Sequence, residues 1–249
     1  LTSLSLSSTS VSGDIAAVKN LTALTGLGLS STSVSGDIAA VKNLTALTSL
    51  SLSSTSVSGD IAAVKNLTAL TGLGLSSTSV SGDIAAVKNL TALTSLKLSS
   101  TSVSGDISAI GSLSKLISCT LNSVIGDILT LNNTKLADII ISNSGGLTGD
   151  IAKLNANFKY LGLNNDKTSR FTWSSRNSSS IIFGNGGTPI LISNLDDMLI
   201  NMAQCRNGIT SSSASWEKNI SYQGNRTSAS DSAVEKLQSY GYNIKISKV

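Results

Sequence analysis

The sequence predicts a solenoid in which short parallel strands stack coil upon coil, and three observations carry this prediction. Gly-Asp pairs recur every 23 residues from residue 13 to residue 106, and two further pairs, after 21 and 23 residues, end at residues 127 and 150. Residues 1–46 and 47–92 are identical letter for letter. Ser (49) and Thr (23) make up nearly three residues in ten, an excess that a repeat explains better than an ordinary globular domain does. A fixed period of this length is the sequence signature of a solenoid.

One unit, LTSLSLSSTSVSGDIAAVKNLTA, contains three expected elements. The alternation of Leu and Ser near its start predicts a short strand with Leu directed inward. Val11 to Ile15 is expected to form a second, short extended segment on the far side. The spacing of Ile15, Val18 and Leu21 suits a 3₁₀ or single α turn. One unit cannot bury these side chains alone, so we expect each apolar column to pack against its own copies in neighbouring coils.

The unit resembles the leucine-rich repeat family, whose pattern is LxxLxLxxN followed by a variable return segment. Leu1, Leu4 and Leu6 fill the three leucines, and Thr9 fills the Asn position, where its hydroxyl can satisfy backbone groups in the turn. The resemblance implies a parallel β-sheet on the concave side, with short second strands and 3₁₀ or short helical turns on the return side. The return segment resembles the plant-type variant of the family, but its Thr-Ser-Val-Ser-Gly-Asp-Ile form more closely resembles repeats in surface proteins of Bacteroidetes-type bacteria and their phages. The resemblance extends from residue 1 to about residue 166.

The repeat degenerates after residue 107 but can still be followed. In the sixth unit, Ile117 and Cys119 are assigned to the first two Leu columns, with Asn122 in the Thr column and Val124 in the Val column. Cys119 is therefore expected to be a buried free thiol that packs as a small hydrophobe. About eight coils are predicted over residues 1–166.

Residues 167–249 are predicted to form irregular last coils and an α/β C-terminal cap. A cap is expected because the last coil would otherwise expose an apolar face and an open sheet edge. The expected elements, in order, are a strand at 181–183, a helix at about 194–204 with Ser193 as N-cap, a strand at 219–223, a helix capped by Ser228 or Ser230, and a strand at 242–246. No equivalent cap precedes residue 1, so we expect an upstream segment or a covering partner at that end.

Composition excludes several kinds of chemistry. The chain has no His, which excludes a His-based triad, an imidazole metal site and a His proton shuttle. Two Cys cannot form a disulfide scaffold or a four-Cys zinc site. The Asp column that begins at Asp14 could suggest a calcium ladder, but one carboxylate per coil favours capping of the turn that follows each Asp. We therefore expect a protein that is not an enzyme and has no metal or cofactor.

The charge pattern separates the first four coils from the rest of the chain. Residues 1–92 carry four Asp and four Lys, so the whole net charge of +4 lies in residues 93–249. This surplus is too small to indicate nucleic-acid binding. No apolar run is long enough to insert in a membrane. The outward strand face of the first four coils contains only Ser and Gly, which are poor anchors for a partner.

Partner binding is therefore expected in the C-terminal half, where larger side chains enter, with Tyr160 and Trp173 as anchors. The candidate binding residues are Lys97, Leu116, Ser118, Asp138, Ile140, Tyr160, Asn164, Arg170, Trp173 and Arg176. An ice-binding surface is a further alternative, but it would need regular exposed Thr on a flat face. The Thr9 column lies at a turn where the family uses this position internally.

The sequence thus favours a non-enzymatic extracellular recognition or adhesion protein, located at a cell surface, with a repeat stalk. Its expected partner is a protein or a glycan on a cell surface. The alternative is a virion component, such as a phage tail fibre or appendage protein, with a host-recognition or structural role.

Overall fold

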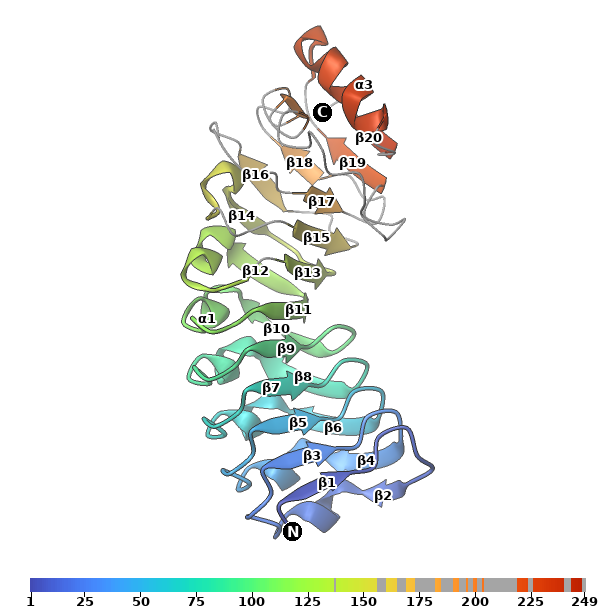
Figure 1. Ribbon diagram of the computed structural model, residues 1–249, viewed down its shortest axis with the longest axis vertical. Helices are drawn as coiled ribbons and strands as arrows, with labels where there is room; N and C mark the ends of the chain where they lie inside the picture. The colour runs from blue at the N-terminus through green and yellow to red at the C-terminus, as the bar shows by residue number, and fades with distance from the viewer. Residues whose placement is uncertain are drawn as a thin grey trace. The chain divides into compact units, whose positions relative to one another are not determined.

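A computed structural model describes most of the repeats and parts of the C-terminal region (Figure 1). The described residues are 1–136, 138–155, 160–164, 169–172, 182–184, 190–192, 196, 199–200, 203, 219–223, 226–239 and 243–247. The chain forms two compact units. Unit 1 comprises Leu1–Ser123 and Asn133–Leu136, and unit 2 comprises Val124–Asn132 and Ala137–Val249. The predicted division of the chain at residue 166 stays a prediction.

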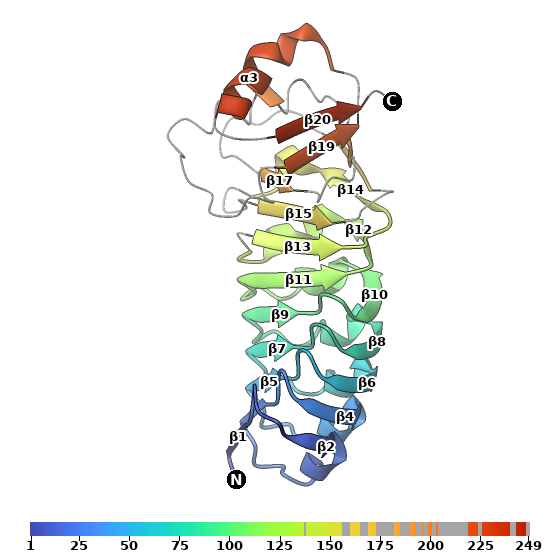
Figure 2. The ribbon, with the colours of Figure 1, turned by 90° about the vertical axis from the view of Figure 1, so that its right-hand side faces the viewer.

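Unit 1 is built from two parallel sheets to which every coil contributes one strand each (Figure 2). The first sheet has the order β1 (Ser3–Ser5), β3 (Gly26–Gly28), β5 (Ser49–Ser51), β7 (Gly72–Gly74), β9 (Ser95–Lys97) and β11 (Ser118–Asn122). The second sheet has the order β2 (Ser12–Asp14), β4 (Ser33–Asp37), β6 (Ser56–Asp60), β8 (Ser79–Asp83) and β10 (Ser102–Asp106). The predicted strand and second extended segment of each coil are therefore confirmed.

The registers of the two sheets differ. In the first sheet each residue pairs with its copy one period along the chain, as Leu4 does with Leu27. In the second sheet Ser12 pairs with Ser33, so the register is offset by two residues from the sequence period. Equivalent positions of successive coils therefore lie opposite one another in the first sheet but not in the second.

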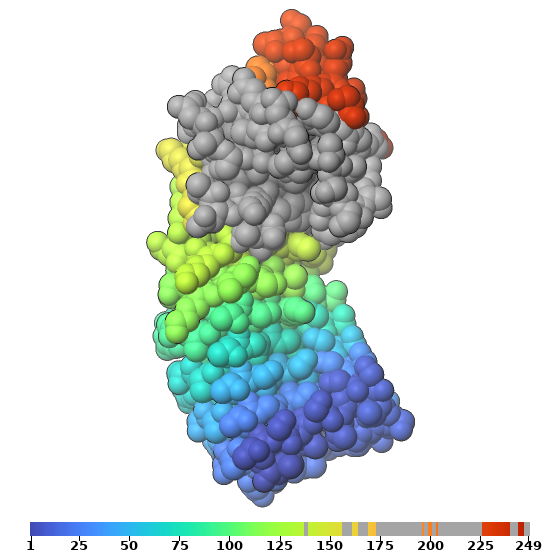
Figure 3. All heavy atoms as spheres, in the orientation of Figure 1, coloured from blue at the N-terminus to red at the C-terminus, as the bar shows by residue number. Residues whose placement is uncertain are grey.

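Short turns link the second sheet back to the first. They are the 3₁₀ turns η1 (Ile15–Val18), η2 (Ile38–Val41), η3 (Ile61–Val64) and η4 (Ile84–Val87), followed by the single α turn α1 (Ser108–Gly111). The predicted 3₁₀ or α turn is thus confirmed. The successive coils of unit 1 appear as bands from blue to green in the space-filling view (Figure 3).

Leucine columns form the core of unit 1, as the pattern predicts. Leu50 and Leu73, on neighbouring strands of the first sheet, are 1% and 2% exposed. The turn after each of these strands is closed by Thr, since the Oγ1 of Thr55 donates to the carbonyl of Leu52 at 2.7 Å and accepts from the N–H of Val57 at 3.4 Å. The residue before this Thr, Ser54, has φ +57°. The turn therefore places a non-Gly residue in the left-handed region, which the sequence pattern does not reveal.

Unit 2 continues both kinds of strand. One row of parallel strands is β13 (Asp138–Ser142), β15 (Tyr160–Asn164) and β17 (Ile182–Gly184). The other is β12 (Val124–Asp127), β14 (Leu147–Asp150), β16 (Arg170–Thr172), β18 (Ile190–Ile192), β19 (Asn219–Gln223) and β20 (Asn243–Ser247). Its turns and helix are η5 (Ile128–Asn133), η6 (Ile151–Lys153), η8 (Ser228–Ser230) and α3 (Asp231–Ser239). The predicted strands near residues 181–183, 219–223 and 242–246 are confirmed.

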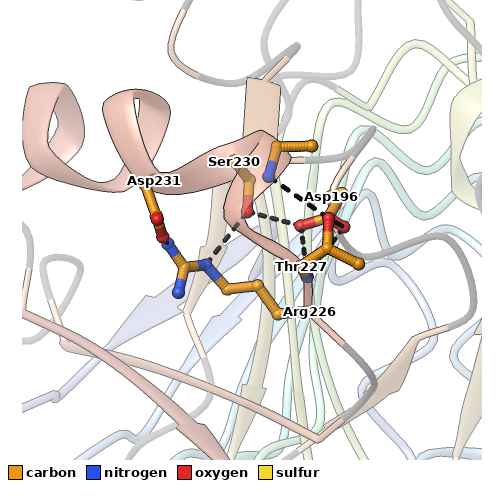
Figure 4. Close-up of polar contacts among 6 residues, drawn as sticks. Asp196, Arg226, Thr227, Ser230 and Asp231 are labelled. Carbon is orange, nitrogen blue, oxygen red and sulfur yellow. Dashed lines mark hydrogen bonds and ion pairs between the residues drawn. The ribbon is translucent and has the colours of Figure 1, made fainter.

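The expected cap of the last helix is wrong. α3 begins at Asp231, and the preceding turn η8 is capped by Thr227, whose side chain accepts from the N–H of Ala229 at 3.2 Å. Ser230 is fully buried and donates instead to Asp196 at 2.5 Å. Asp196 also accepts from the backbone and the hydroxyl of Thr227 (Figure 4). Ser193, the expected N-cap of the helix at 194–204, lies outside the described residues, whereas Asp196, Leu199 and Ala203 are helical.

These contacts lower the pKa of Asp196. Partial burial raises its pKa, but the hydrogen bonds from Ser230 and Thr227, together with the positive charge of Arg226, outweigh that effect and hold the pKa below its ordinary value. Arg226 also donates to Ser230 and forms an ion pair with Asp231. In the part of the chain that the structure describes, no helix is long and apolar enough to span a membrane.

Candidate functional site

The outward face of the first sheet is small and uncharged over the first four coils. Equivalent strand positions hold Ser in one coil and Gly in the next, so that Ser49 on β5 pairs with Gly72 on β7. Neighbouring hydroxyls bond each other along the face, as between Ser30 and Ser51 at 2.6 Å and between Ser99 and Ser76 at 2.9 Å. This surface therefore offers no charged or large apolar side chain to a partner.

The character of the same face changes at coils five and six. Lys97 on β9 is exposed, and so is Ser118 on the neighbouring strand β11, where it pairs with Ser95. Ile117, just before β11, is 56% exposed, which sets it apart from the buried leucines. The Oγ1 of Thr120, which pairs in register with Lys97, is buried and has no hydrogen-bond partner within the described residues.

Leu116 is not a surface residue, so its assignment to the binding face is wrong. Its side chain is fully buried, whereas Ile117 is exposed. The pairing of Cys119 with Leu96 and of Ser118 with Ser95 shows the cause, because the period of 23 continues unbroken to this strand. Leu116 therefore occupies the first Leu column. Ile117, which had been assigned to that column, occupies the column that contains Thr2, Thr25, Thr48, Thr71 and Thr94.

The remaining candidates divide between the two rows of unit 2. Asp138 and Ile140 on β13 pair with Tyr160 and Gly162 on β15, and Ser142 pairs with Asn164, so these strands bring four of the candidates together. Ile140 is half-buried between the fully buried Ile139 and Ile141, as alternation requires.

Arg170 is exposed but lies on β16, in the other row, where it pairs with Thr148. It is therefore not brought together with the candidates on β13 and β15. Trp173 and Arg176 lie outside the described residues. Whether any of these residues binds a partner stays a prediction.

The Asp column caps turns, as expected. The Oδ1 atoms of Asp14, Asp37 and Asp60 each accept the backbone N–H two residues on, at 2.7 to 2.8 Å. The same bond recurs at Asp83, Asp106, Asp127 and Asp150. Among the described residues, His, Cys, Asp and Glu form no group of three or more that could hold a metal ion.

Five of these seven Asp also fit against the Gly of the next coil, a contact that sequence reasoning missed. Gly59 has φ +101°, and a Cβ at this position would lie 2.3 Å from the Oδ1 of Asp37. Gly36 has φ +99° and stands in the same relation to Asp14. The Gly-Asp pair therefore allows successive coils to stack closely, because Gly leaves room for the capping carboxylate of the preceding coil.

Shallow grooves lie between the return turns of successive coils. One, of about 370 Å³, is lined by Asp14, Asp37, Lys19 and Lys42 among others, and another, of about 310 Å³, by Asp83, Asp106 and Lys88. Each groove combines both signs of charge and small Ala side chains. They follow from the spacing of the coils and carry no distinctive set of reactive groups.

Cys119 is a buried free thiol, as predicted. Its side chain is 2% exposed, and burial raises the pKa of the thiol well above its ordinary range. It is therefore protonated at neutral pH and poorly nucleophilic. Its contribution is to the core.

Two groups of exposed threonines also follow the repeat. One is Thr22, Thr45, Thr68 and Thr91, and the other is Thr25, Thr48, Thr71 and the half-buried Thr94. In the second group each Oγ1 donates to the carbonyl of the Thr one coil earlier, at 3.0 Å. The Thr9 column, in contrast, is internal from the third coil on, with Thr55, Thr78 and Thr101 all buried.

Comparison with solved structures places the fold among leucine-rich repeat proteins. An internalin (inlF) from Listeria monocytogenes is similar over 99% of this chain and 76% of its own, with 24% identity and a TM-score of 0.61. The PEPR1–AtPEP1 structure is similar over 70% of this chain, with 26% identity and a TM-score of 0.61. A plant ice-binding protein is similar over 77% of this chain and 73% of its own, with 21% identity and a TM-score of 0.58.

This chain spans about a quarter (26%) of the length of the PEPR1–AtPEP1 chain. No protein-family model matches the sequence, and no curated protein matches it either. The likeness in structure, together with the two parallel sheets and 3₁₀ turns, establishes a leucine-rich repeat solenoid.

Proposed function

We propose that the chain is a non-enzymatic extracellular recognition or adhesion protein that binds a protein or glycan on a cell surface through its C-terminal half. The observation that carries the proposal is the contrast along the first sheet. Its first four coils present only Ser and Gly, whereas Lys97 and Ile117 begin a richer surface. Large and charged side chains supply most binding energy at protein interfaces, so the first coils act as a stalk.

Further support comes from structures of the same fold. PEPR1 was solved together with AtPEP1, and the internalin is a second protein with this architecture. A surface protein of Bacteroidetes-type bacteria and a phage tail fibre or appendage protein both suit such a stalk. A bacterial surface is the preferred setting, and immunogold labelling of intact cells and purified virions with one antibody distinguishes the two.

Deletion of residues 47–92 tests where the partner binds. The deleted segment is identical to residues 1–46 and comprises two whole coils, so the register of both sheets can re-form. We expect a folded, shorter protein that keeps its hits on a glycan array and its binding to intact cells. Loss of these hits from a folded deletion variant would place the site on the repeats and overturn the proposal.

Substitution of the two anchors tests the site itself. Tyr160→Ala combined with Trp173→Ala should weaken binding to the same array and cells and leave the circular dichroism spectrum unchanged. The matched control is Tyr222→Ala on β19, which lies outside the candidate set. Unchanged binding by the double variant would contradict a C-terminal site.

A second candidate function is ice binding, favoured by the two exposed threonine columns. They lie three residues apart in each coil and repeat at the strand spacing of about 4.8 Å, so methyl and hydroxyl groups form a regular array. The intended test is thermal hysteresis. Thr48→Lys with Thr71→Lys should abolish any activity, whereas Ser56→Lys with Ser79→Lys, on exposed positions of the second sheet, should preserve it. Wild-type protein without thermal hysteresis would eliminate this candidate.

A further inference from the structure

Three lysines surround an exposed isoleucine in coils five and six of unit 1. Ile117 is 56% exposed, and Lys97, Lys115 and Lys135 are all exposed. The backbone brings Lys135 next to Ile117, because its N–H donates to the carbonyl of Leu116 at 3.1 Å. We call Lys97, Lys115, Ile117 and Lys135 the basic patch.

Lys97 lies at the other end of the basic patch. It pairs in register with Thr120 on β11, three residues along the chain from Ile117. At about 3.3 Å per strand residue, the separation is roughly 10 Å. The basic patch therefore extends over a length that a few residues of an extended chain would cover.

Within unit 1, no ion pair of the described residues includes a lysine of the basic patch. The two ion pairs among the described residues, Lys153 with Asp150 and Arg226 with Asp231, do not include its lysines. The carboxylates of coils four and five, Asp83 and Asp106, end the strands of the second sheet and cap the turns that follow. Within unit 1, these two carboxylates accept backbone N–H groups and form no ion pair with the lysines of the basic patch.

The fold does not require these side chains. In the first four coils Thr occupies the position of Ile117, Ala that of Lys115, and Ser or Gly that of Lys97. The backbone bonds are the same, since the N–H of Ile117 donates to Thr94 at 2.9 Å as that of Thr71 does to Thr48 at 2.8 Å. An exposed Ile also buries little apolar surface in the folded chain, so it adds little to stability.

We propose that the basic patch binds a short acidic peptide segment that carries an apolar side chain. The lysines supply charge complementarity, and Ile117 supplies the apolar contact at its centre. This inference rests on the proposed recognition function and names the chemistry of the partner. Every second side chain of an extended peptide lies on the same side, so an acidic residue and an apolar residue two positions apart, at about 6.6 Å, can both face the basic patch.

The experiment uses the whole chain and a fluorescein-labelled peptide of three Glu-Ser-Leu-Ser repeats, called the Glu-Leu peptide, with fluorescence anisotropy as the readout. Its extended form presents Glu and Leu on the same side. Two control peptides, in which Lys replaces every Glu or Ser replaces every Leu, test the charge and the apolar contact. We expect saturable binding of the Glu-Leu peptide, at least about tenfold weaker binding of the other two, and weakening as salt rises from 50 to 300 mM, values chosen to span the screening range. Absence of saturable Glu-Leu binding overturns the proposal.

The variants restore the residues of the neighbouring coils, so they keep the fold. Ile117→Thr should weaken Glu-Leu binding about three- to tenfold, and Lys97→Ser with Lys115→Ala about tenfold or more. Lys42→Ala with Lys65→Ala removes the same charge from the return turns and should change binding less than about twofold. An equal loss in this control means that net charge alone attracts the peptide, and the proposal fails.

Three further outcomes test the peptide assignment and separate this proposal from the proposed function. A heparin fragment that binds more tightly than the Glu-Leu peptide, and is lost in the lysine variant, identifies a sulfated glycan instead and overturns the peptide assignment. If Ile117→Thr and the lysine variant still bind intact cells as the wild type does, the basic patch is not the recognition site, while the recognition function itself stands. If wild-type protein binds the Glu-Leu peptide but neither cells nor arrays, the recognition function fails and the basic patch remains.

Discussion

Gly59→Ala is the sharpest test of how the coils are held together. Gly59 has φ +101°, and a Cβ there would meet the Oδ1 of Asp37 at 2.3 Å. A non-Gly residue in such a conformation costs about 1–3 kcal/mol. The same Cβ displaces a carboxylate that accepts the Ala39 N–H at 2.8 Å, and losing this cap costs about 1 kcal/mol more.

We expect Gly59→Ala to lower the free energy of unfolding by about 2 kcal/mol. This net value allows for the about 0.4–1 kcal/mol by which Ala stabilises the protein through restriction of the unfolded chain. Urea unfolding followed by circular dichroism measures it. Gly72→Ala is the matched control, since a Cβ at Gly72 meets nothing within 4 Å and its backbone is ordinary. The control should be neutral or slightly more stable than the wild type.

A double-mutant cycle separates backbone strain from the clash. In an Asp37→Ala background the carboxylate is absent, so Gly59→Ala should cost about 1 kcal/mol less than in the wild type. Equal midpoints for Gly59→Ala and Gly72→Ala would show that neither the strain nor the Gly-Asp contact stabilises the stack, and the reasoning would be refuted.

Three other measurements test the remaining features. Thr78→Val should lose about 1–2 kcal/mol in urea unfolding, because the buried Oγ1 donates to Leu75 and accepts from Val80, whereas the exposed Thr68→Val should change stability by less than about 0.5 kcal/mol. In a Cys205→Ser background, Cys119 should not react with Ellman's reagent until the chain unfolds, and fast reaction of the native thiol would contradict its burial. The folded pKa of Asp196 is depressed, so its contribution to folding stability is present above about pH 4 and is lost as the pH falls through the folded pKa. Asp196→Asn should therefore reduce the loss of near-ultraviolet circular dichroism signal that acid causes. An unaltered acid transition would show that the Asp196 contacts do not stabilise the cap.

The sequence correctly predicts those features that depend on residues within a single coil. The Leu alternation gave the first strand, the spacing from Ile15 gave the 3₁₀ turn, and the Asp before that turn proved to be its cap. Each of these depends on local geometry that the letters of a single unit express. The burial of Cys119 followed from its column in the same way.

The sequence does not predict features that depend on contacts between coils, such as strand register. The second sheet pairs Asp14 with Ser35, two residues off the sequence period, and this offset places the Asp14 carboxylate beside Gly36. Nothing in the period itself indicates that offset. Leu116 and Ile117 were exchanged for a related reason, because two adjacent apolar residues fit the degenerate pattern equally and only the strand register separates them.

The Thr227 cap was missed because Ser228 and Ser230 offer the same chemistry to a reader of the sequence. What decides between them is Asp196, which lies 31 residues from Thr227 and accepts both its backbone N–H and its hydroxyl. Ser230 is drawn to the same carboxylate and so serves as a buried donor. A long-range contact has overridden the local capping preference of Ser.

The identical coils also make it possible to separate surface from scaffold. Coils one to four show that Thr, Ala and Ser or Gly at the positions of the basic patch support the same strands and the same backbone bonds. Stability in a solenoid is approximately a sum over coils and their interfaces, so substitutions that restore these residues should leave the stack intact. Any change in binding that such variants cause must then come from the side chains removed. A repeat whose copies are this uniform supplies its own controls, and departures from uniformity such as Ile117 are the places where function, rather than folding, best accounts for the residue.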